Sequence, residues 1–266
     1  MPSVGGRVAL LRSYRLQEMD ESNPQALARI GGSGFARADL MRFRRRFERL
    51  LLSYQFGMDE VLTKINILKT EFEHLHDYSP IEHVSSRLKS AESTLAKAKR
   101  RQESVSLASL RDITDIAGIR IVCSFITDVY WIAKMLTQQA DITVIEVKDY
   151  IENPKPNGYK SLHLILKVPV FLSDSVEDIT VEVQVRTVAM DFWASLEHKI
   201  YYKYDKDVPG ELLAELVNAA AVANQLDLTM ERLHTEVRGG RAEPPVADAD
   251  EDELHDRLIE QFLGAD

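Results

Sequence analysis

Cysteine is nearly absent from this chain, since its 266 residues include a single one, Cys123. One thiol excludes an internal disulfide framework, which requires at least two. Near the N-terminus, no basic start is followed by a sustained apolar run, so neither a secretion signal nor a membrane segment is predicted. We therefore expect a cytoplasmic protein with no membrane partner.

Glycine-rich phosphate loops are missing as well. Neither the Walker pattern Gly-x-x-x-x-Gly-Lys-[Ser/Thr] nor Gly-x-Gly-x-x-Gly occurs. Any phosphate site must therefore be built from side chains. The chain also lacks an excess of positive charge: its net charge of -9 argues against general affinity for nucleic acid, which depends on a broad basic surface.

Hydrophobic residues make up 45% of the chain, enough for one sizeable core. Residues 1–36 contain several glycines and no persistent apolar period, and they are predicted to be a flexible N-terminal extension. Residues 37–238 form the predicted domain. Residues 239–266 are predicted to be an acidic tail, because nine acids and two arginines follow from Arg241 onward.

Apolar side chains recur at steps of three and four in several segments, which predicts helices. The segments are 50–75, 128–139, 188–204 and 211–237. An arginine-rich lead-in, residues 42–49, precedes the first. A solvated helix face is its preferred interpretation, and contact with RNA or phosphate is the alternative.

Alternating apolar residues predict strands at 119–125, 142–150, 161–168 and 179–187, and hence an α+β fold. In the last of these, Glu182 and Gln184 point away from the core, because the valines between them point toward it. Asp115 stands just before the first strand. Gly118 is expected to mark a close backbone approach.

Basic residues gather between Arg87 and Arg101, where six stand against one acid, Glu92. Lys89, Ser93 and Lys97 are spaced by four, so on a helix they would form one stripe with Arg100 beside it. A polyphosphate is the natural ligand of such a stripe. A solvated charged face is the alternative.

These parts together suit a metal-assisted phosphoryl transfer between two nucleotides. Mg²⁺ binds through a few carboxylate oxygens and keeps positions for water and phosphate, so Asp115 and Glu182 would suffice. Both acids are expected to face a hydrated cleft and to repel each other. A loop at 151–161 with two prolines is expected to expose Lys155, Asn157 and Tyr159, and the tyrosine ring could stack on a base.

Five segments resemble the synthetase domain of RelA/SpoT-type enzymes, and especially the stand-alone small alarmone synthetases of the RelP and RelQ kind. They are His-Val-Ser-Ser-Arg-Leu-Lys-Ser at 83–90, residues 112–122, Asn-Gly-Tyr-Lys-Ser-Leu-His at 157–163, Glu-Val-Gln-Val-Arg-Thr at 182–187 and residues 189–199. The resemblance implies a nucleotidyltransferase-like mixed β-sheet flanked by helices, with long N- and C-terminal helices. It also implies transfer of pyrophosphate from ATP to the 3′-hydroxyl of GDP or GTP, and a homotetramer.

The resemblance also implies roles for individual residues. Asp115 and Glu182 would be catalytic and hold Mg²⁺. The residues implied for ATP are Arg87, Lys89, Ser93, Lys97 and Arg100. Those implied for GDP or GTP are Lys155, Asn157, Tyr159, His163 and Gln184.

Two other functions stay open on the residues alone. The first is a nucleotidyltransferase of the same fold, which would attack the α-phosphate and release pyrophosphate. The second is a non-catalytic regulator that binds a nucleotide effector or RNA through residues 42–49 and 87–101. Retention of both Asp115 and Glu182 argues against the second, because a binding protein needs no paired metal carboxylates.

Overall fold

The structure is a computed structural model that describes residues 37–76, 78–101, 106–203 and 209–237. The chain divides into two units, Met1–Arg49 and Leu50–Asp266. The predicted extension at 1–36 and the predicted acidic tail at 239–266 lie outside the described residues.

Helix α3 (Arg37–Leu75) begins before the apolar period that predicted it. In the first unit, Arg44 forms an ion pair of 3.0 Å with Glu48, one helical turn later, and Arg45 and Arg46 are exposed. No helix among the described residues is both long enough and apolar enough to cross a membrane.

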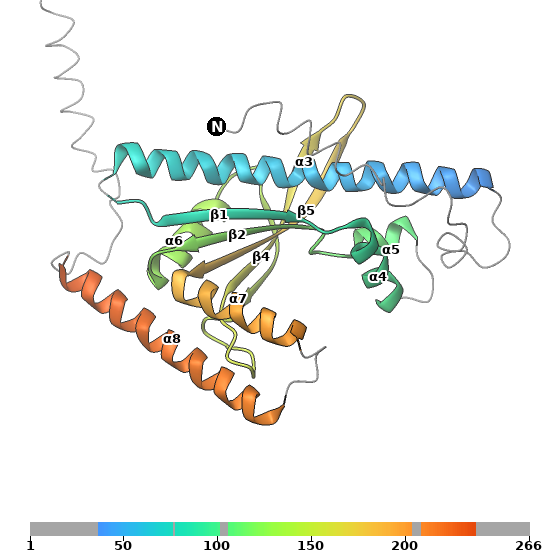
Figure 1. Ribbon diagram of the computed structural model, residues 1–266. Helices are drawn as coiled ribbons and strands as arrows, with labels where there is room; N and C mark the ends of the chain where they lie inside the picture. Colours follow the sequence, from blue (N-terminus) through green and yellow to red (C-terminus); the bar gives the residue numbers. More distant parts are fainter. Residues whose placement is uncertain (1–36, 77, 102–105, 204–208, 238–266) are drawn as a thin grey trace, which may run out of the picture. The chain divides into compact units, whose positions relative to one another are not determined.

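The described part of the second unit contains one five-stranded sheet in the order β1-β2-β5-β4-β3 (Figure 1). Strands β2 and β5 are parallel and all other neighbours are antiparallel, so the sheet is mixed, as predicted. The strands are β1 (Ile81–Leu88), β2 (Ala117–Cys123), β3 (Thr143–Asp149), β4 (Leu162–Phe171) and β5 (Val176–Thr187). The remaining helices are α4 (Ala91–Arg101), α5 (Leu107–Arg111), α6 (Ile126–Thr137), α7 (Val188–Lys203) and α8 (Gly210–Val237).

Strand β1 was not predicted, and it breaks up the expected basic stripe. Arg87 lies on this edge strand and Lys89 follows it, while Ser93, Lys97 and Arg100 lie on α4. The sequence Ile-Glu-His-Val-Ser-Ser-Arg-Leu lacks apolar alternation because most of the strand is exposed. Its pairing with β2 stabilises it instead.

The core lies between the sheet and two helices, α3 and α6. On β5, Val181, Val183 and Val185 are fully buried, and this face was predicted correctly. Helix α3 approaches so closely that a Cβ on Gly57 would lie 2.5 Å from Cγ2 of Ile179. The glycine inside this helix therefore allows the helix to pack on the sheet. The buried side chains of α6 are Val129, Ile132, Ala133 and Leu136.

The start of α6 differs from the prediction. Phe125, expected at the end of a strand, is the N-cap residue, and the helix begins at Ile126 rather than Asp128. The Asp128 carboxylate accepts from the backbone N–H of Phe125 at 3.1 Å. Glu231, on distant α8, accepts from the N–H of Ile126 at 2.8 Å. A cap supplied from another helix leaves no local signal in the sequence.

Helices α7 and α8 pack side by side (Figure 1), and the Trp193 indole donates to the carbonyl of Leu216 at 3.0 Å. The loop before β4 lies against α8 at Gly158. This glycine has a φ of 86°, and a Cβ there would lie 2.4 Å from Cβ of Ala220. Both facts require glycine, and together they fix the loop that carries Tyr159.

Candidate functional site

A cleft of about 400 Å³ lies over the polar face of β1, β2 and β5. Strand register explains which residues meet there, because Arg87, Gly118 and Glu182 are partners across the three strands. Two positions away on each strand, Ser85, Arg120 and Gln184 are again partners. The lining consists of Ser85, Ser86, Arg87, Lys89, Asp115, Gly118, Ile119, Arg120, Glu182 and Gln184.

Gly118 does not mark the expected close backbone approach. A Cβ at this position would meet only the carbonyl oxygen of Arg87, at an ordinary 3.6 Å. Gly118 therefore leaves open space in the cleft between Arg87 and Glu182, where a side chain would project.

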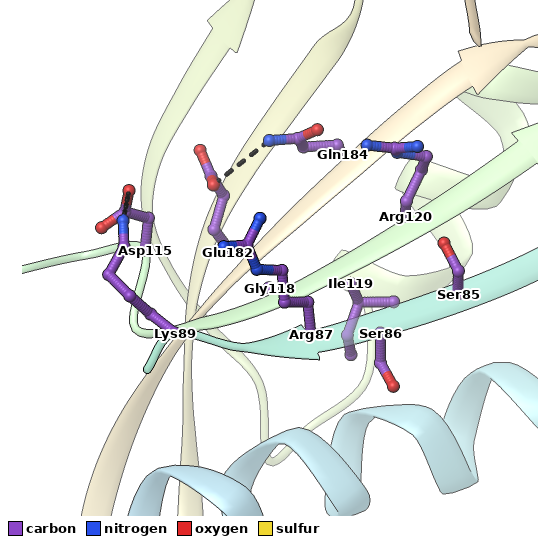
Figure 2. A pocket seen from close by; sticks show the side chains of 10 residues that line it. All are labelled: Ser85, Ser86, Arg87, Lys89, Asp115, Gly118, Ile119, Arg120, Glu182 and Gln184. Atoms are coloured by element: carbon purple, nitrogen blue, oxygen red, sulfur yellow. Dashed lines mark hydrogen bonds and ion pairs between the residues drawn. The ribbon is translucent and has the colours of Figure 1, made fainter. Parts of the chain in front are cut away.

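Asp115 stands at one end of the cleft, beside Lys89 (Figure 2). Its Oδ2 accepts from Lys89 Nζ at 2.8 Å and from Lys97 Nζ at 2.7 Å. Burial alone would raise the pKa of Asp115, but the hydrogen bonds and charges of the two lysines outweigh burial and lower it. The carboxylate expected to hold a metal is therefore ionised and paired with two residues expected to bind ATP.

The second oxygen of Asp115 favours a metal. Oδ1 is buried and has no hydrogen-bond partner among the residues that the structure describes. A buried carboxylate oxygen without a donor is a suitable ligand for a hard cation such as Mg²⁺. Within the same described residues, no three His, Cys, Asp or Glu side chains gather as a ready metal cage. Two carboxylates with water and phosphate are the arrangement that Mg²⁺ prefers.

Glu182 lies between Asp115 and Gln184 along the cleft (Figure 2). Its Oε1 pairs with His163 Nδ1 at 3.1 Å, and its Oε2 accepts from Gln184 Nε2 at 3.2 Å. Burial and the nearby charge of Asp115 raise the pKa of Glu182, but His163 and Gln184 lower it further, so the net shift is downward. The expected repulsion between the two acids exists and is outweighed.

Three more contacts complete a hydrogen-bonded ring of side chains that includes Glu182. His163 Nε2 lies 2.7 Å from the hydroxyl of Tyr159, and Arg186 Nη2 donates to that hydroxyl at 2.7 Å. The same Nη2 donates to Oε1 of Gln184 at 2.6 Å. The hydrogen-bonded ring thus consists of Glu182, His163, Tyr159, Arg186 and Gln184.

The loop at 151–161 exposes less than expected. Lys155 is exposed, with its Nζ 4.5 Å from the ring centre of Tyr150 and 4.6 Å from that of Tyr159. Asn157 and Tyr159 are half-buried, and Asn157 donates to Glu197 of α7 at 3.0 Å. Burial raises the pKa of the Tyr159 hydroxyl despite the adjacent Arg186.

The predicted site residues thus fall into three groups. The cleft lining includes Arg87, Lys89, Asp115, Glu182 and Gln184, and Lys97 joins it through Asp115. Tyr159 and His163 join it through the hydrogen-bonded ring. The third group does not line the cleft and consists of Lys155, Asn157, Ser93 and Arg100. Ser93 and Arg100 are exposed on α4, where the Ser93 hydroxyl contacts that of Ser90 at 2.9 Å.

Three functional candidates were missed. Arg120 lines the cleft and forms an ion pair of 3.2 Å with Asp191 of α7, which also pairs with Arg186 at 3.2 Å. Arg186 is four positions after Glu182, and a period of two places it on the same strand face, so the sequence held a signal for it. Asp191 gave none, because its role depends on how α7 packs.

The sheet and cleft define an α+β protein with paired acids and several cationic side chains in a site suited to nucleotide polyphosphates. A family model described as "Region found in RelA / SpoT proteins" matches residues 86–207. The chain is 49% identical over 188 residues to GTP pyrophosphokinase YwaC of Bacillus subtilis (strain 168), covering 70% of this chain and 90% of that protein. The chain belongs to the RelA/SpoT family and to its small alarmone synthetases.

Two solved structures support this assignment. Small alarmone synthetase 1 from Bacillus subtilis bound to its product pppGpp matches with a TM-score of 0.67 and 37% identity, over 75% of this chain and 100% of that chain. The same synthetase bound to AMPCPP matches with a TM-score of 0.63 and 34% identity, over 73% of this chain and 99% of that one. The fold predicted from the sequence is confirmed.

Proposed function

We propose that this protein is a GTP pyrophosphokinase, which transfers pyrophosphate from ATP to the 3′-hydroxyl of GDP or GTP and releases AMP. The products are the alarmones ppGpp and pppGpp. Support comes from a relative named GTP pyrophosphokinase and from similar structures bound to pppGpp and to the ATP analogue AMPCPP.

One observation carries the proposal: Asp115, just before β2, and Glu182, on the neighbouring parallel strand β5, line the same cleft as Arg87 and Lys89. On the donor side, Arg87 and Lys89 bind ATP, and Lys97 contacts its phosphates. Phosphate oxygens are strong acceptors, so they can replace Asp115 as the partner of both lysines. ATP binding thereby frees the Asp115 carboxylate. Ser93 and Arg100 lie outside the cleft lining, but they share α4 with Lys97, and we assign them to the outer edge of the donor site.

On the acceptor side, Tyr159 offers a ring to guanine, while Lys155, Asn157 and Gln184 surround the nucleotide. Glu182 is kept ionised by its two hydrogen bonds, so it can accept the proton of the 3′-hydroxyl as that oxygen attacks the β-phosphate. His163 holds Glu182 in place through its Nδ1 contact.

Asp115 and Glu182 would also hold Mg²⁺, which fits the unpartnered Oδ1 of Asp115. The ion would offset the charge that develops on the transferred phosphates. Lys89 and Lys97 contribute in the same sense once they contact the phosphates, because in the ligand-free protein both cationic groups lie within 3 Å of Asp115.

Product identity tests this function directly. The protein is incubated with ATP, Mg²⁺ and either GDP or GTP, and nucleotides are separated by anion exchange. We expect AMP and a guanosine 3′-diphosphate, whereas release of pyrophosphate would instead indicate nucleotidyl transfer. Lys97→Ala should lose activity and Lys99→Ala, an exposed neighbour on α4, should keep it. Absence of both products would remove the proposal.

We extend the proposal to the assembly and the location of the protein. Helix α8 leaves apolar side chains exposed, among them Val222, Leu226, Met230 and Leu233, and we propose that they pack in a homotetramer. Light scattering would test the tetramer. We further propose a cytoplasmic enzyme, with the exposed arginines of residues 42–49 as the place for an RNA or nucleotide effector.

A further inference from the structure

Arg186 is the most enclosed charge in the hydrogen-bonded ring: its side chain is only 5% exposed. Its guanidinium donates to four acceptors. These are the Ser161 hydroxyl at 3.2 Å, the Asp191 carboxylate at 3.2 Å, the Tyr159 hydroxyl at 2.7 Å and the Gln184 amide oxygen at 2.6 Å. A buried arginine with this many partners is held in one orientation.

An arginine can only donate and an ionised carboxylate can only accept, so Arg186 and Glu182 together set the direction of the hydrogen bonds that run between them. Because the Tyr159 hydroxyl accepts from Arg186, its own proton is available to His163 Nε2. The imidazole then carries its proton on Nδ1, where it donates to Glu182.

The other side of the ring, from Arg186 through Gln184 to Glu182, is directed in the same way. Since Arg186 donates to Oε1 of Gln184, the amide group of Gln184 must turn its NH₂ toward Glu182. Both oxygens of Glu182 therefore face donors. Without Arg186, only Glu182 would direct the two sides of the ring, so Gln184 and His163 would be oriented from one end of each side instead of from both.

We propose that Arg186 is a positioning residue for the transfer reaction, which sets the hydrogen-bond direction on both sides of Glu182 through Tyr159 and Gln184. The inference rests on the proposed function, because Glu182 and Tyr159 belong to the acceptor side of that reaction. Arg186 itself is too enclosed to bind a nucleotide.

The first test needs no turnover. Nitrogen-15 NMR of the ligand-free protein reports the tautomer of each histidine, and His163→Gln identifies the signal of His163. We expect the Nδ1–H form in the wild type and loss of that preference in Arg186→Met. An unchanged tautomer in the folded variant would overturn the proposal.

The second test separates the two substrates. Arg186→Met should lower kcat and raise the KM for the guanine nucleotide by about ten- to a hundredfold in kcat/KM, the range for one charge-assisted hydrogen bond. The KM for ATP should stay within about twofold, because Arg186 contacts none of the residues assigned to ATP. Equal losses for both substrates would contradict the assignment.

Thr187→Val is the matched control for lost stability. Thr187 is buried next to Arg186 in the chain, but its hydroxyl donates to Asp227 of α8 at 2.8 Å, outside the ring. The control should lower the melting temperature while leaving the His163 tautomer and the acceptor KM unchanged. A change in both would show that instability alone produces the effect.

A double variant tests whether Arg186 acts through Tyr159. Arg186→Met combined with Tyr159→Phe should be less impaired than the product of the two single losses, and multiplicative losses would refute the coupling. If Arg186→Met does not fold, Arg186→Lys keeps the charge but cannot reach four acceptors, and the same readouts apply. Synthesis of alarmone by the wild type decides the proposed function separately from all these outcomes.

Discussion

Replacing Asp115 with asparagine should reduce stability as well as activity. In the ligand-free protein, Oδ2 of Asp115 holds both Lys89 and Lys97, so the substitution leaves two cations close together without their counter-ion. The side chains are 20% to 26% exposed, between a surface pair and a buried one. We therefore expect a loss of roughly 1–2 kcal/mol in the free energy of unfolding. Repulsion between Asp115 and Glu182, taken alone, would instead predict an unchanged or higher free energy of unfolding.

The pH dependence of this loss has a definite sign. In the folded protein the pKa of Asp115 is lower than its ordinary value of 3.8, so the folded state favours the carboxylate. Its contribution is fully present above 3.8 and disappears as the pH falls through 3.8 and then through the folded pKa. The stability gap between wild type and Asp115→Asn should therefore be constant near pH 7 and narrow below about pH 4.

Urea unfolding at several pH values measures the gap, and alarmone synthesis measures the catalytic effect, which should be a loss of at least about a thousandfold. Asp141→Asn is a suitable control, because Asp141 pairs with a different lysine, Lys64, at 2.7 Å and is 49% exposed. It should cost little stability and no activity. An Asp115→Asn variant as stable as the wild type at pH 7 would refute the lysine pairing, and near-normal turnover would place the chemistry elsewhere.

The remaining predictions concern the two substrates and one turn. Arg87→Ala and Lys97→Ala should raise the KM for ATP about ten- to a hundredfold and that for GDP much less, and equal effects would contradict the donor assignment. Tyr159→Ala should weaken mainly GDP binding, which calorimetry would detect. Gly158→Ala should lower the free energy of unfolding by at least about 2 kcal/mol, since its φ is positive and its Cβ would strike α8. Gly210→Ala, with open space around it, is the control for thermal unfolding.

Much of the fold could be predicted where a strand buries one face. In β5, the buried valines alternate with half-buried Glu182 and Gln184, and both the strand and the orientation of these two side chains were predicted. The long helices α3 and α8 were predicted by the same reasoning, because a sustained apolar period of 3.6 residues has few other interpretations.

Strand β1 and the contacts of Asp115 could not be predicted in this way. An edge strand with mostly exposed side chains shows no alternation, so the basic residues around it fitted a helix equally well. The pairing of Asp115 with Lys89 and Lys97 depends on how β1 and α4 pack beside β2. No pattern within a single element contains that information.

The topology of the sheet explains how one cleft can serve two nucleotides. The strand pair β1 and β2 stands on the ATP side, where β1, the residue after it and α4 carry the side chains assigned to ATP. The antiparallel pair β4 and β5, with the loop before β4, carries those assigned to the guanine nucleotide. The two pairs meet where β2 runs parallel to β5, and Gly118 faces Glu182 across that junction. Asp115 precedes β2 and Glu182 lies on β5, so the two acids stand on opposite sides of the junction. In the proposed reaction the transferred phosphates lie over this junction, and the absence of a side chain at Gly118 leaves space there.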